Sequence, residues 1–119
     1  MASGVEPIGI RIERVWVNTE NLNKVYYATT ISLNLSNYDF YFIKCKYNTS
    51  TARFNVSGWF PVNGDEYQVM GLRLNNNNSA SRAFTYVPLS QEMNIADAYY
   101  NGSTDSTYML PVEIYGVKL

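Results

Sequence analysis

Strict alternation of apolar and polar side chains is the main pattern in this chain. It is clearest within residues 29–35, where Ile31, Leu33 and Leu35 alternate with polar residues. It resumes in residues 39–47, where one face carries Tyr41, Ile43, Cys45 and Tyr47. A period of two residues is typical of a strand with one buried face. Because only a short turn-forming stretch separates the two segments, we expect them to pair as an antiparallel hairpin whose apolar face needs a second layer.

The same alternation predicts further strands over most of the chain, separated by stretches rich in Asn, Ser, Gly and Pro. We place these strands at residues 5–17, 53–59, 67–74, 83–87 and 108–119. In the first of them the apolar parity changes at Val15, which indicates a β-bulge or a strand covered on both faces.

Three connecting stretches carry more specific signals. Residues 75–81 (NNNNSAS) favour the tip of a hairpin, and Asn101-Gly102 is a strong two-residue hairpin signal. Residues 89–98 are the only segment that tolerates a helical interpretation. Because Asn and Asp within them disfavour a long helix, we expect a connector with one helical turn or a short edge strand.

These elements predict an all-β fold, a single antiparallel β-sandwich of jelly-roll type with at most one short helical turn. We expect residues 5–119 to form this one domain, and residues 1–4 to be a flexible N-terminus or a remnant added for expression. A chain of 119 residues can bury enough apolar surface to fold without a metal or a disulfide.

Charge and hydropathy exclude two classes of partner. Nine Lys and Arg against ten Asp and Glu give a net charge of −1, with no dense basic run, so we expect no nucleic-acid partner. No apolar run approaches the length of about 18 residues that a membrane span needs, and the N-terminus lacks a signal-peptide core. We therefore expect that the chain is made in the cytoplasm and does not insert into a membrane.

The chain offers little for catalysis or metal binding. It has no histidine and one cysteine, Cys45, which falls on the apolar face of its strand and is expected to be buried and inert. Zinc sites and the usual nucleophile–histidine pairs are excluded, and we expect no cofactor, no metal and no catalytic residue. Paired carboxylates are the remaining catalytic route, and Asp97, Asn101 and Asp105 could chemically form a calcium site, although ordinary turns are favoured.

Aromatic side chains provide the stronger signal. The chain has 11 tyrosines, and the pairs Tyr99-Tyr100 and Trp59-Phe60 flank turns. Because neighbouring strand residues point to opposite faces, one ring of each pair should be exposed. An exposed ring beside Asn and Ser suits a carbohydrate or a protein partner, although tyrosine is also an ordinary strand residue. The predicted contact surface comprises Tyr99, Tyr100, Asn101 and Asp105, with Trp59 and the tip at residues 75–78 as outliers.

Three segments resemble the C-terminal domains of phage and prophage tail proteins. Residues 110–118 (LPVEIYGVK) resemble the "I-Y-G-I-K" finish of those domains, and residues 32–40 (SLNLSNYDF) resemble their "L-x-L-S-x-Y-D" segment. Residues 16–18 (WVN) are similar to their opening "W-x-N" strand. After residue 18 the chain departs from that pattern, because a loop containing Asn and Lys replaces the usual small residues.

The resemblance implies a non-enzymatic β-domain at the tip of a tail fibre or baseplate, located in the virion. It implies a host-surface glycan or a virion protein as partner and a homo-oligomer, with a trimer favoured. It supplies no catalytic residues. Two alternatives stay open: a stand-alone carbohydrate-binding module, and an architectural virion subunit such as a capsid decoration or connector protein.

Overall fold

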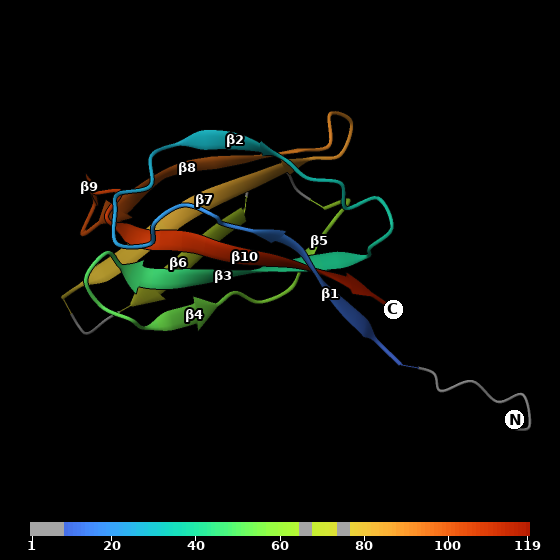
Figure 1. Ribbon diagram of the computed structural model, residues 1–119, viewed down its shortest axis with the longest axis horizontal. Coiled ribbons are helices and arrows are strands. Elements are labelled where there is room, and N and C mark those ends of the chain that lie inside the picture. The colour runs from blue at the N-terminus through green and yellow to red at the C-terminus, as the bar shows by residue number, and fades with distance from the viewer. Residues whose placement is uncertain (1–8, 65–67, 74–76) are drawn as a thin grey trace, which may run out of the picture.

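The computed structural model describes residues 9–64, 68–73 and 77–119, which form two antiparallel sheets stacked as a sandwich (Figure 1). The first sheet has the order β1-β10-β3-β4, with β5 also beside β3. Its strands are β1 (Arg11–Val17), β3 (Phe40–Asn48), β4 (Phe54–Val56), β5 (Phe60–Pro61) and β10 (Tyr108–Lys118). The predicted all-β sandwich is confirmed. The predicted N-terminal segment 1–4 lies outside the described residues.

The second sheet has the order β2-β8-β7-β6, with β9 beside β8. Its strands are β2 (Thr29–Ser32), β6 (Gln68–Arg73), β7 (Ser79–Val87), β8 (Glu92–Tyr100) and β9 (Ser103–Thr104). The predicted hairpin tip at 75–81 lies partly outside the described residues, and β7 already begins within it. No helix in the described part of the chain is long and apolar enough to cross a membrane.

The predicted hairpin between residues 29–35 and 39–47 is wrong. The first segment forms β2 beside β8 in the second sheet, whereas the second forms β3 beside β10 in the first. Between them the chain crosses the core, where Leu33 and Leu35 are buried. Their backbone N–H groups donate to the Gln91 carbonyl and the Tyr86 hydroxyl. The alternation therefore marks a segment that crosses between layers rather than one arm of a hairpin.

The expectation for residues 89–98 also fails. Glu92–Tyr100 is a nine-residue strand, β8, placed between β2 and β7. Met93 and Ile95 point into the core and are buried, while the Asn94 side chain accepts a hydrogen bond from the Thr30 hydroxyl at 2.7 Å. The polar residues that disfavour a helix lie here on the outer face of the sheet.

The core lies between the sheets and follows the predicted alternation. It comprises Tyr41, Ile43 and Cys45 of β3 with side chains from β7, β8 and β10. Cys45 is fully buried, as predicted, and its burial raises the pKa of the thiol to about 12. The predicted irregularity near Val15 is also present, because the register of β1 against β10 shifts between Arg14 and Trp16.

Candidate functional site

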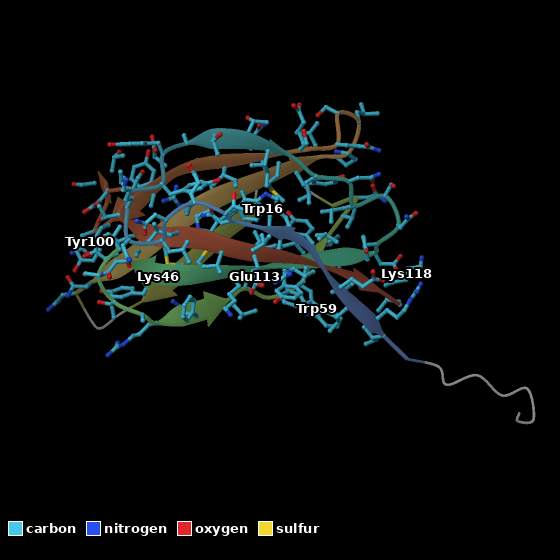
Figure 2. The ribbon with its side chains drawn as sticks, viewed as in Figure 1. Trp16, Lys46, Trp59, Tyr100, Glu113 and Lys118 are labelled. Carbon is cyan, nitrogen blue, oxygen red and sulfur yellow. The ribbon has the colours of Figure 1, made fainter. Side chains whose placement is uncertain are left out.

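Four of the five predicted contact residues come together at the β8–β9 hairpin. Tyr99 and Tyr100 end β8, and Tyr100 pairs with Ser103 across the predicted turn. Asn101 and Gly102 have φ values of 51° and 81°, as a tight hairpin turn requires. Asp105 follows β9. Trp59 lies elsewhere, between β4 and β5, and Figure 2 shows it well separated from Tyr100.

The polar groups of this hairpin are used by the hairpin itself. The Asn101 side chain accepts a hydrogen bond from the Ser79 N–H at 2.9 Å and donates one to the Asn78 side chain at 2.8 Å. Asp105 accepts hydrogen bonds from the Thr107 N–H and hydroxyl. These oxygens therefore cap turns, and among the described residues no three acidic, Cys or His side chains gather as a metal site would need.

The Tyr99 and Tyr100 rings point to opposite faces of the sheet, as neighbouring strand residues should. Tyr100 is half-buried and stacks on Tyr108, with ring centroids 4.2 Å apart and planes 12° apart. Tyr108 in turn meets Tyr47 edge-on at 5.6 Å. Tyr99 points outward and is 49% exposed. The hairpin thus presents the Tyr99 ring, and the side-chain amide of Asn101 is already hydrogen-bonded to Ser79 and Asn78.

A better-formed concave site lies beside the connection from β1 to β2. It is a cavity of about 470 Å³. Its lining consists of residues 16–20, residues 25–29 and Ile31. Three aromatic rings take part: Trp16 is half-buried, Tyr26 is buried, and Tyr27 is 70% exposed. We call this the aromatic cavity.

Sequence reasoning missed the aromatic cavity, although a signal was present. The adjacent pair Tyr26-Tyr27 follows a polar loop, as Tyr99-Tyr100 precedes one. The same alternation rule that predicts one exposed ring in the second pair applies to the first. What the sequence does not show is that the end of β1, with Trp16, lies beside this pair.

Hydrogen bonds hold the connection against β3, β8, β10 and the segment between β9 and β10. The Asn18 N–H donates to the Val112 carbonyl at 2.8 Å, and the Tyr26 N–H donates to the Ser106 carbonyl at 3.1 Å. The Ala28 N–H donates to the Asp97 carboxylate at 2.8 Å. The buried Lys46 ammonium binds the middle of the loop by donating to the Leu22 carbonyl and the Asn23 side chain. The walls of the cavity are therefore anchored at several points.

A buried arginine supports the cavity from inside the sandwich. Arg82 of β7 is 0% exposed, and its guanidinium lies 5.6 Å from the centroid of the Tyr26 ring. It donates hydrogen bonds to four carbonyls, those of Ala96, Ser106, Tyr108 and Met109. Desolvation lowers the pKa of Arg82, while burial and the nearby Glu20 carboxylate raise the pKa of the Tyr26 hydroxyl.

The open part of the cavity is polar and carries no positive charge in its described lining. Thr19, Glu20 and Thr29 are exposed there, and Glu20 is the single carboxylate of the lining. Within the described residues Glu20 forms no salt bridge. The site can therefore stack an apolar face on Tyr27 and exchange hydrogen bonds with hydroxyl groups, and it disfavours anions.

Comparisons with known proteins identify no relative of this chain. No protein-family model matches the chain, and a search of the curated proteins finds no significant match.

Proposed function

We propose that this chain is a non-enzymatic recognition domain of a phage tail that binds an uncharged saccharide in the aromatic cavity. The observation that carries the proposal is the composition of the lining, where the exposed Tyr27 ring stands beside Thr19, Glu20 and Thr29 and no cation is present. The virion location rests on the resemblance of residues 16–18, 32–40 and 110–118 to the ends of tail proteins.

The chemistry of the lining matches that of a sugar. A pyranose ring has an apolar C–H face, which stacks on an aromatic ring, and an edge of hydroxyls, which need donors and acceptors. Tyr27 offers the ring, and Thr19 and Glu20 offer the hydrogen-bonding groups. The volume of about 470 Å³ lies within the usual range of small-ligand sites. Because the lining holds a carboxylate and no Lys or Arg, neutral sugars are favoured over sialylated or phosphorylated ones.

The lining supports binding rather than hydrolysis. A glycosidase needs two carboxyl groups about 5 to 9.5 Å apart across the scissile bond. Glu20 is the single carboxylate among the residues that line the aromatic cavity. One carboxylate can accept hydroxyl hydrogen bonds, but it cannot act as both general acid and nucleophile in the same step.

A glycan array followed by calorimetry tests the proposal. We expect binding to neutral oligosaccharides, and we expect Tyr27→Ala to weaken it at least about fivefold, since stacking on one ring contributes on the order of 1 kcal/mol or more. Tyr99→Ala is the matched control, because it removes the exposed ring of the hairpin. Loss of binding in Tyr99→Ala alone would move the site to the hairpin, and an array without any bound glycan would refute saccharide recognition.

An architectural role in a virion is the second candidate. It is favoured by the outer face of the first sheet, where three large apolar side chains from one segment are exposed: Phe54 at 49%, Val56 at 59% and Trp59 at 44%. Such a face suits a protein contact. A chain that binds no glycan but co-purifies with assembled particles would support this role. A chain that binds glycan and is absent from particles would instead be a stand-alone carbohydrate-binding module.

A further inference from the structure

Among the residues that the structure describes, none pairs with the outer edge of β1. β1 stands at the end of the first sheet, and within the described residues only β10 pairs with it. Figure 1 shows its beginning projecting past the body of the sandwich, at the end where the chain also terminates. Ile10 and Ile12 are 53% and 51% exposed there. An exposed edge with apolar side chains is a template for another strand.

The side chains of this edge alternate in character. Arg11 and Glu13 point to one face of the strand, while Ile10, Ile12 and Arg14 point to the other. Arg14 is bound at 3.0 Å to Glu113 of β10. Arg11 and Glu13 form no salt bridge among the described residues, although the Tyr38 hydroxyl lies beside Glu13. Two opposite charges are thus spaced two residues apart on an unpaired edge.

Of the registers centred on residues 11, 12 and 13, one suits a second copy of the chain. Hydrogen-bonding and non-hydrogen-bonding positions alternate along an antiparallel pair, so two identical strands related by a two-fold axis must be centred on a residue. Centring on Arg11 places Arg opposite Arg, and centring on Glu13 places Glu opposite Glu. Centring on Ile12 places Arg11 of each copy opposite Glu13 of the other, and Ile12 opposite itself.

Charge decides between these registers. Opposite charges that face each other directly across a pair are stabilising, and like charges are destabilising. The register centred on Ile12 gains two such contacts by symmetry, together with an apolar contact on the other face. Charged residues on an edge strand usually prevent pairing, whereas here they permit one arrangement and oppose its neighbours.

We propose that two copies of this chain associate through β1, antiparallel and centred on Ile12, so that their first sheets join into one continuous sheet. The occupant of the open edge is a second copy rather than another protein because the Arg11–Glu13 pattern is complementary to itself. This inference does not depend on saccharide binding. It predicts two-fold association, in contrast to the trimer expected from the resemblance.

Sedimentation velocity on four chains tests the register. At concentrations from about 10 µM to about 1 mM, where small interfaces associate, we expect dimers of the wild type. Arg11→Glu and Glu13→Arg should each be monomeric, because each places like charges opposite one another twice. Mixed in equal amounts they should form a heterodimer, in which both contacts become attractive. Arg53→Glu, on an exposed turn away from β1, is the matched control and should dimerise as the wild type does.

A cross-linking measurement tests the same register without relying on the folding of the charge-reversal variants. In the proposed pair Ile12 of one chain faces Ile12 of the other, so Ile12→Cys should form a disulfide-linked dimer under mild oxidation. The natural cysteine, Cys45, is buried and does not compete. Val56→Cys, at a site of similar exposure, is the control and should cross-link at least about tenfold more slowly. A wild-type monomer or trimer, a mixture that stays monomeric, or equal cross-linking at both sites would overturn the proposal.

Discussion

The β8–β9 hairpin and the β1–β2 connection contain similar residues but use them differently. In the hairpin, the Asn101 amide and the Asp105 carboxylate are bound to their own neighbours, and Tyr100 is stacked on Tyr108. In the connection, backbone groups make most of the anchoring contacts, which leaves the Tyr27 ring and the Glu20 carboxylate open to solvent. A suitable composition therefore marks a binding site only where the fold has not already used the polar groups.

Both regions depend on one support, Arg82. Its guanidinium donates to the Ser106 and Tyr108 carbonyls, which follow the hairpin, and lies over the ring of Tyr26, which lines the aromatic cavity. The fully buried arginine places its charge among these carbonyls, and the Ser106 carbonyl also accepts from the Tyr26 N–H, so Arg82 and the connection meet at one acceptor. The two regions therefore differ in their surface side chains and share the buried contacts of Arg82.

The largest expected effect comes from removing this shared support. We expect Arg82→Met to lower the free energy of unfolding by about 3–5 kcal/mol, because several buried carbonyls lose their donor together. Urea denaturation measures the change. Arg53→Met replaces an exposed arginine and should shift the free energy by no more than about 0.5 kcal/mol. If the two variants are equally stable, the buried network contributes nothing and the two regions do not share a support.

The sequence predicts most of the strands, although not the central strand β8, and it predicts their partners poorly. Alternation records which side chains are buried, so the sandwich and the positions of Tyr41, Ile43 and Cys45 follow from it. It does not record which sheet a strand joins, and residues 29–35 were therefore paired with the wrong neighbour. The role of Arg82 is equally hidden, because its partners are backbone carbonyls that any residue carries. The aromatic cavity depends on a contact between distant segments, which no local pattern encodes.

An intermediate effect is expected at the hairpin turn. Asn101→Ala removes both side-chain hydrogen bonds and places alanine at a φ of 51°. Together these changes should destabilise the fold by about 1–2 kcal/mol without altering saccharide affinity. Asn37→Ala, at an exposed turn position, is the control and should be close to neutral. A loss of saccharide affinity in Asn101→Ala would mean that the hairpin recognises the ligand and would reverse the comparison.

The smallest effect is expected at Asp97, and it depends on pH. Hydrogen bonds from the Ala28 N–H and the Ser106 hydroxyl lower the pKa of Asp97 below its ordinary value of 3.8. A lowered pKa means that this contribution to stability is present above about pH 4 and is lost as the pH falls through the folded-state value. At neutral pH we expect Asp97→Asn to cost about 1 kcal/mol, near the low end for hydrogen bonds to a charged group because Asp97 is partly exposed.

The measurement is urea denaturation of the wild type and of Asp97→Asn between pH 7 and about pH 2.5. Glu113 also contributes in this range, because its pKa is lowered, mainly by the hydrogen bond from Arg14. Because Glu113 is common to both chains, its effect cancels in the difference, which should shrink on acidification. Saccharide affinity should fall over the same range, since Asp97 holds Ala28 at the wall of the cavity. A difference that stays constant with pH would show that the Asp97 charge does not anchor the connection, and the cavity would then depend on its backbone contacts and on Lys46.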